Sequence, residues 1–266
     1  MLIRSTWTLM PDGGVSLPKS YALELAKTLH TRLKIDMGSE GVPSTRFAGL
    51  VGNCSTSREF VTFRPEEFYQ LSLSGLQDAS SKAIADLDLG DQLQLLGATF
   101  TIVNREDETT SYEALYHEQV ADEPEPVHAF DLRFVTPTAF AQNRLYLPLP
   151  VPQLMFRSWL ERWNHFAPVY LGGDELVGYL GEAIALSRHR IQTCSVQVHQ
   201  KPITGFTGDV SLRVLSRLDP LLANVAYLLV QYAQFSGTGI KNRLGMGYTM
   251  PYDRVSLNHH DVILSH

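Results

Sequence analysis

The sequence predicts an α+β protein built from two consecutive ferredoxin-like (RRM-like) domains. Apolar residues recur with strand and helix periods along the whole chain, the expected elements follow the order strand, helix, strand, strand, helix, strand, and this order occurs twice. An acidic segment separates the two rounds. We therefore expect an N-terminal domain at residues 1–126 and a C-terminal domain at residues 127–266.

The first round begins with an alternating strand at residues 2–10 and a turn at Asp12-Gly13-Gly14. Pro18 suits a helix start, and apolar residues at helical spacing extend that helix over residues 21–35. Residues 38–43 are expected to form a loop. The other expected elements are strands at 46–52, 58–63 and 67–76, a helix capped by Asp78 and reaching Leu87, and a strand at 92–103.

The second round follows an acidic linker at residues 105–126, which ends at Pro124 and Pro126. A strand is expected at 127–136, and Pro150-Val151-Pro152 opens a helix that reaches Trp163. Trp159 and Trp163, four residues apart on that helix, are expected in the core. The remaining expected elements are strands at 191–198 and 208–215, an apolar helix from Asp219-Pro220 to Phe235, and strands at 246–250 and 254–257.

Composition excludes several classes of protein. A disulfide scaffold or a structural zinc site is not expected, because Cys54 and Cys194 are the only cysteines and stand far apart in the chain. The apolar segment at 221–235 is shorter than the ~20 residues that a membrane span needs. The first ten residues alternate and do not form an apolar export signal. We expect a cytoplasmic protein with no cofactor, no bound metal and no membrane contact.

Charge is distributed unevenly. Residues 106–125 carry eight acidic residues and no Lys or Arg, whereas residues 184–254 carry eight Lys or Arg against three Asp, a net charge of +5. A polyanion can therefore bind the C-terminal half although the whole chain has a formal net charge of −6. An ordinary solvated surface with one acidic loop explains the same distribution.

A glycine-rich loop follows the last predicted helix. Gly237, Gly239, Gly245 and Gly247 lie within eleven residues, with Lys241 and Arg243 between them. Glycine permits positive φ, and exposed backbone N–H groups in such a loop can hold phosphate oxygens. The dinucleotide fingerprint does not fit, because Asn242 stands where that motif needs its third glycine. The Walker loop does not fit either, because Met246 follows Gly245 where that motif needs Lys. A tight turn after a helix remains the simpler interpretation.

The spacing Gly-x-Gly-x₅-Gly-x-Gly after an apolar run resembles the C-terminal signature of the RAMP superfamily of CRISPR proteins. The segments Phe134-Val135-Thr136-Pro137 and Gly205-Phe206-Thr207-Gly208, together with the glycine loop, most resemble one branch. That branch is the CRISPR-associated endoribonuclease that processes precursor repeat RNA (pre-crRNA), the sixth numbered Cas family. Asn242 departs from it, since Thr is frequent there.

This resemblance implies an endoribonuclease that needs no metal. The ribose 2′-OH attacks the adjacent phosphorus and the 5′-oxygen leaves, which yields a 2′,3′-cyclic phosphate and a 5′-OH end. The implied partner is CRISPR repeat RNA, and other Cas proteins of an effector complex are further candidates. The oligomeric state stays open.

His30 is the candidate catalytic residue, because family members often carry a histidine on or just after the first helix. Imidazole suits proton transfer near neutral pH. His30 flanks the apolar stripe of its predicted helix, so we expect an accessible imidazole beside Lys27 and Lys34. Lys27 and Arg32 are its expected catalytic partners. A surface histidine on an amphipathic helix is the simpler interpretation.

Cations and glycines complete the predicted RNA-binding surface. Ser187-Arg188-His189-Arg190 is expected to form a basic loop, which either contacts an RNA stem or is an ordinary solvated loop. The predicted RNA-binding residues are Gly237, Gly239, Lys241, Arg243, Gly245, Gly247, Lys34, Arg188 and Arg190.

Two other functions remain open. The first is a RAMP protein that binds crRNA as a structural subunit of an effector complex and does not cut it. The second is a ferredoxin-like protein whose glycine loop holds a small nucleotide.

Overall fold

The computed structural model describes residues 1–35, 41–198, 201–215 and 219–252. Its residues cluster into two compact units. The first unit contains Met1–Thr109, Ser195–Ile203 and Lys241–Met246, and the second contains Thr110–Cys194, Thr204–Ile240 and Gly247–His266. The domain boundary expected near residue 127 stays a prediction, and no sequence signal indicated that two later segments join the first unit.

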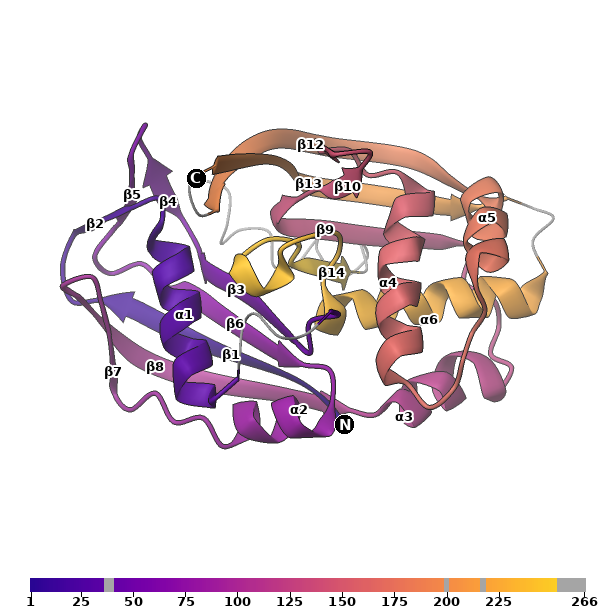
Figure 1. The fold of residues 1–266 in the computed structure, drawn as a ribbon, viewed down its shortest axis with the longest axis horizontal. Helices are drawn as coiled ribbons and strands as arrows, with labels where there is room; N and C mark the ends of the chain where they lie inside the picture. Colours follow the sequence, from indigo (N-terminus) through magenta and orange to yellow (C-terminus); the bar gives the residue numbers. More distant parts are fainter. Residues whose placement is uncertain (36–40, 199–200, 216–218, 253–266) are drawn as a thin grey trace. The chain divides into compact units, whose positions relative to one another are not determined.

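The first unit has a five-stranded sheet in the order β3-β6-β1-β8-β7. Helix α1 follows β1 and helix α2 follows β6, so β1, β3, β6 and β8 have ferredoxin-like connectivity. Both helices lie on one face of the sheet (Figure 1). The bounds are β1 Leu2–Pro11, α1 Tyr21–Leu33, β3 Thr45–Val51, β6 Tyr69–Gly75, α2 Asp78–Ala85, β7 Gln92–Leu95 and β8 Ala98–Thr110.

Period-two alternation places one face of β1 in the core of the first unit. Ile3, Trp7 and Leu9 are buried in the same cluster as Leu25 and Leu29 of α1. β1 pairs with β6 in antiparallel register from Ile3↔Gly75 to Leu9↔Tyr69. The strand and the helix predicted here are confirmed, because their apolar positions face one another.

A small sheet in the order β2-β5-β4 was only partly predicted. Its strands are β2 (Val15–Pro18), β4 (Cys54–Thr56) and β5 (Phe60–Phe63). Pro18 is the last residue of β2, so its predicted role at the helix start is wrong, although the helix begins at Tyr21 as predicted. Phe63 of β5 is fully buried and meets the ring of Tyr21 edge-on, with centroids 5.4 Å apart.

Turn chemistry corrects two further predictions. The strand expected over 92–103 is a hairpin, because Leu96 (φ 50°) and Gly97 (φ 83°) turn the chain between β7 and β8. The cap of α2 is Gln77, whose side chain forms a capping box with Ser80, and Asp78 is the first helical residue.

The acidic linker expected over residues 105–126 is mostly regular structure. β8 continues to Thr110, and a short helix α3 (Tyr112–Tyr116) and a π-helical turn η1 (His117–Ala121) follow. Arg105 anchors the strand, since its guanidinium donates to the carbonyl oxygens of Ile84, Ala85 and Leu87 at the end of α2. The carboxylates at residues 106–108 therefore lie on the last part of strand β8 and not in a linker.

The second unit repeats the connectivity with a sheet in the order β12-β13-β9-β14. The fold-class prediction, tandem ferredoxin-like α+β, is confirmed. The hairpin β10–β11 and helix α5 had no sequence signal that we recognised. The bounds are β9 Ala129–Thr138, β10 Phe140–Gln142, β11 Leu145–Leu147, α4 Pro152–Phe166, α5 Asp174–Ala183, β12 Ile184–Val198, β13 Lys201–Val214, α6 Pro220–Ser236 and β14 Thr249–Tyr252.

Helices α4 and α6 hold the core of the second unit. Trp159 and Trp163 are fully buried, as predicted. The Asp219 carboxylate caps α6 by accepting the N–H of Leu221 at 2.8 Å. The strand predicted at 246–250 begins at Thr249, and the one at 254–257 lies outside the described residues. None of the helices described has the length and apolarity that crossing a bilayer requires.

Candidate nucleic-acid interface

The glycine loop leaves α6 with four glycines in the left-handed half of backbone space. Gly237, Gly239, Gly245 and Gly247 have φ values of 68°, 75°, 92° and 75°. At Gly239 the fit is also tight, because an added Cβ would lie 2.2 Å from the carbonyl oxygen of Ala139. Only glycine meets both conditions at this position.

The backbone N–H groups at both ends of the loop already have partners within the second unit. The N–H groups of Thr238, Ile240 and Gly247 donate to the carbonyl oxygens of Gly247, Ala139 and Pro137, at 2.8, 3.0 and 3.0 Å. Those of Gly237 and Gly239 donate to Ala233 O and Ser158 Oγ, both at 2.8 Å. The prediction that these amides are exposed for phosphate is wrong, since the glycines permit close packing here.

Helix α4 holds the first half of the loop through three side chains. Ser158 Oγ accepts the N–H of Gly239, and Arg162 Nη2 donates to the carbonyl oxygen of Gly239 at 2.6 Å. Trp159 Nε1 donates to Thr238 Oγ1 at 2.8 Å, and the hydroxyl of Thr249 donates to the same oxygen. Thr238 and Gly239 are therefore fixed from both helix and strand.

The centre of the loop, Lys241–Met246, clusters with the first unit. It contains a 3₁₀ turn η2 (Asn242–Leu244) that contacts β3 and α1. An added Cβ at Gly245 would lie 3.6 Å from Ala22 Cβ, which locates this turn beside the first turn of α1. Lys241 is exposed with φ 57°, and Arg243 is half-buried. The centre of the loop therefore presents the Lys241 side chain at the surface.

His30 is buried, and the prediction of an accessible imidazole is wrong. It is 1% exposed, Nδ1 donates to Ala26 O at 2.7 Å, and Nε2 lies 3.0 Å from Thr45 Oγ1. Because a carbonyl only accepts, a neutral ring carries its proton on Nδ1 and accepts the Thr45 hydroxyl at Nε2. This geometry joins α1 to β3 and directs both nitrogens into protein.

Three cations lie near His30 in the sequence: its predicted catalytic partners Lys27 and Arg32, and Lys34, which was predicted to share its helical face. Lys27 is half-exposed and pairs with Glu24 at 2.8 Å, and Arg32 is exposed. Lys34 is exposed but is the left-handed C-cap of α1 (φ 56°), so it does not continue the helical face of His30 as predicted. The hydrogen-bond partners of the imidazole given above, Ala26 O and Thr45 Oγ1, include none of these cations.

Arg188 and Arg190 lie on a strand and not in the predicted loop. Both belong to β12, the edge strand of its sheet, and both are exposed. Residues two apart on a strand share a face, so both arginine side chains lie on the same face of this edge strand. The tail histidines His259, His260 and His266 lie outside the described residues.

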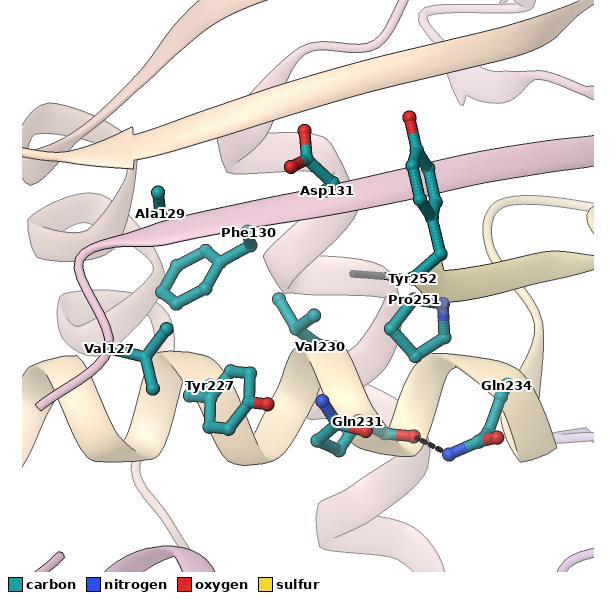
Figure 2. Close-up of a pocket in the computed structure, with 10 residues that line it drawn as sticks. All are labelled: Val127, Ala129, Phe130, Asp131, Tyr227, Val230, Gln231, Gln234, Pro251 and Tyr252. Carbon is teal, nitrogen blue, oxygen red and sulfur yellow. Dashed lines mark hydrogen bonds between the residues drawn. The ribbon is translucent and has the colours of Figure 1, made fainter. Parts of the chain in front are cut away.

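A separate pocket of about 520 Å³ lies in the second unit between α6, β9 and β14. Figure 2 shows Phe130, Tyr227 and Val230 at its base and the Asp131 carboxylate directed across the strand, away from α6. Tyr227 stacks on Phe130 with centroids 5.7 Å apart. None of the predicted site residues lines this pocket, whose lining mixes polar and apolar side chains.

Sequence reasoning missed the residues that shape the loop. Ser158 and Arg162 are one helical turn apart on α4, and Arg162 Nη1 bonds Ser158 Oγ. This spacing is detectable in the sequence. Nothing in the sequence pairs either residue with Gly239, which lies far along the chain.

Comparison with known proteins gives a family match over residues 132–249, to the CRISPR-associated endoribonuclease Cas6. The Cas6 of Mycobacterium tuberculosis (strain CDC 1551 / Oshkosh) is 32% identical over 118 residues, 44% of this chain and 37% of that protein. The Cas6 of Streptococcus thermophilus is 28% identical over 119 residues, 44% of this chain and 48% of that protein. The matches therefore span less than half of these relatives, and the family match at residues 132–249 does not include α1.

Solved structures match the whole fold. A Cas6 product complex has a TM-score of 0.72 and 21% identity, and covers 95% of this chain and 100% of that chain. A Cas6 of Thermus thermophilus has a TM-score of 0.69 and 22% identity, and covers 95% of this chain and 98% of that chain. At this identity the likeness shows the fold alone.

Proposed function

From the match of residues 132–249 to the CRISPR-associated endoribonuclease Cas6, we propose that this chain is a member of that family, binds CRISPR repeat transcripts and cleaves once within each repeat. The observation that carries the proposal is that the matched segment includes the entire glycine loop, whose central turn presents Lys241 at the surface. A transcript substrate would place the enzyme in the cytoplasm. Other Cas proteins are proposed as further partners.

The proposed reaction needs no metal. The 2′-OH loses its proton and attacks the adjacent phosphorus, the bond to the 5′-oxygen breaks, and that oxygen takes up a proton. The products are a 2′,3′-cyclic phosphate and a 5′-OH end. Cations such as Lys27, Arg32 and Lys241 would stabilise the charge that develops on the phosphorus oxygens.

The burial of His30 argues against direct proton transfer by its imidazole. Both ring nitrogens are within hydrogen-bond distance of protein oxygens, whereas a general base needs to reach the proton that it takes. His30 also lies outside the segment that matches the family. We therefore propose that His30 links α1 to β3, and its catalytic role stays a prediction.

Repeat RNA tests the proposal directly. End-labelled repeat RNA from the same genome, incubated with the purified protein in EDTA, is expected to give one cut with a cyclic phosphate end. Treatment of the product with acid followed by phosphatase identifies that end. A cut that appears only after a divalent metal is added would contradict the metal-independent step.

The burial of His30 also favours one alternative, a subunit that holds crRNA without cutting it. Tight, salt-sensitive binding of repeat RNA with no cleavage would establish this alternative. Binding of mononucleotides in preference to RNA would contradict both functions.

Replacing Lys241 by alanine is expected to weaken RNA binding without changing where the RNA is cut. Lys241 is exposed, and loss of one phosphate contact reduces the slope of log K against log salt by about 0.7 to 0.9. Filter binding measures that slope between about 50 and 300 mM salt, the range over which phosphate contacts weaken. The matched control is Lys82→Ala, an exposed lysine on α2. Equal slopes in the two variants would remove Lys241 from the interface.

A further inference from the structure

We propose that Arg162 is a positioning residue for RNA binding: it fixes the backbone of the glycine loop immediately before the Lys241 turn. The inference rests on the proposed function, and nothing in the family match assigns a role to this residue. Arg162 lies on α4, more than seventy residues before the loop, and both belong to the second unit up to Ile240.

Arg162 donates hydrogen bonds both within its own helix and to the loop. Nη1 donates to the carbonyl oxygen of Ser158 at 2.8 Å and to Ser158 Oγ at 2.5 Å. Nη2 donates to the carbonyl oxygen of Gly239 at 2.6 Å. The planar guanidinium holds these acceptors in one geometry, which a flexible ammonium cannot reproduce.

Together these bonds fix two successive peptide groups. The peptide between Thr238 and Gly239 is held through its N–H by Ser158 Oγ. The peptide between Gly239 and Ile240 is held at both ends, because its oxygen accepts from Arg162 and its N–H donates to Ala139 O at 3.0 Å. A peptide group beside glycine rotates at little steric cost, so it needs such partners to stay in one orientation.

The position of Arg162 strengthens this restraint. Its side chain is half-buried, and burial lowers the pKa of the guanidinium below its usual value. Arginine remains protonated in proteins, so its bonds to Gly239 and Ser158 are charge-assisted and stronger than neutral ones. Lys241 follows Gly239 by two residues and has the unfavourable φ of 57°. Fixing the preceding peptides therefore limits the directions in which the Lys241 side chain can leave the loop.

Hydrogen exchange of the loop tests the restraint without RNA. In Arg162→Gln, the amides of residues 237–240 are expected to exchange at least about tenfold faster, as loss of a charged hydrogen bond implies. The matched control is Arg157→Gln on the same helix, since Arg157 is half-exposed and lies 3.7 Å from the exposed Asp174. If the loop amides of the two variants exchange equally, the proposal is wrong whatever the activity.

RNA binding then separates positioning from simple support of the fold. At a temperature well below unfolding, Arg162→Gln is expected to bind repeat RNA at least about tenfold more weakly, with Arg157→Gln unchanged. Arg162→Lys should recover part of the loss, because it retains one charged donor. A more mobile loop with unchanged RNA affinity would overturn the proposal. If the wild-type protein neither binds nor cuts repeat RNA, the proposed function fails. That result is distinct from equal hydrogen exchange of the loop amides in Arg162→Gln and Arg157→Gln, which contradicts the positioning role alone.

Discussion

Replacing Gly239 by alanine is expected to lower the free energy of unfolding by about 3 kcal/mol or more, through backbone strain and overpacking together. The new methyl group would lie 2.2 Å from the carbonyl oxygen of Ala139, and φ is +75°. That oxygen accepts the N–H of Ile240, so the loop cannot move away without breaking this bond. Urea unfolding followed by circular dichroism measures the loss.

Gly90→Ala provides the matched control for this substitution. Gly90 has a similar φ of +71°, but nothing lies within 4 Å of an added Cβ. It should therefore cost only the conformational part, about 1 to 2 kcal/mol. Equal losses in the two variants would show that the close approach of Gly239 to Ala139 is not a source of stability.

Replacing His30 by alanine is expected to lower the free energy of unfolding by about 2 to 4 kcal/mol. The substitution opens a cavity and removes the imidazole from the buried polar groups that it bonds. The side chain is 1% exposed and joins Ala26 O of α1 to the Thr45 hydroxyl of β3. Thermal unfolding with and without the substitution measures this loss.

Cleavage by the folded fraction of His30→Ala decides between its two roles. A structural His30 predicts a cleavage rate, per folded molecule, within a few-fold of the wild-type rate. A catalytic His30 predicts a loss of about 100-fold or more together with normal RNA binding. Thr45→Val removes the hydroxyl that faces Nε2 and keeps the imidazole. If His30→Ala is as stable as the wild-type protein and inactive, the structural role is wrong.

Local periodicity was sufficient to predict most of the framework. The alternation in residues 2–10 and the helical spacing in residues 21–35 predicted β1 and α1, which the structure has at Leu2–Pro11 and Tyr21–Leu33, because both elements bury a single apolar face. Periodicity did not reveal the β10–β11 hairpin. Its turn residues Asn143 and Arg144 both have positive φ, and Arg144 is not a residue type that indicates such a turn.

The sequence predicted which residue types occur in the candidate site, but it did not predict which residues they contact. The glycine spacing correctly indicated positive φ at Gly237, Gly239, Gly245 and Gly247. The helical pattern placed His30 at the edge of the apolar stripe, but β3 covers that edge through Thr45. Which residues cover a helix edge, or bond a loop carbonyl, depends on pairs far apart in the chain, and a single sequence does not report such pairs.

The assignment of Lys241–Met246 and Ser195–Ile203 to the first unit has a consequence for biosynthesis. Residues 1–109 of this unit are synthesised first, yet the unit lacks its last segment until residue 246 has left the ribosome. Until then, the part of α1 and β3 beside Gly245 has no covering turn. Contacts of such long sequence separation slow folding, so the N-terminal unit should reach its native packing late, after translation has passed residue 246.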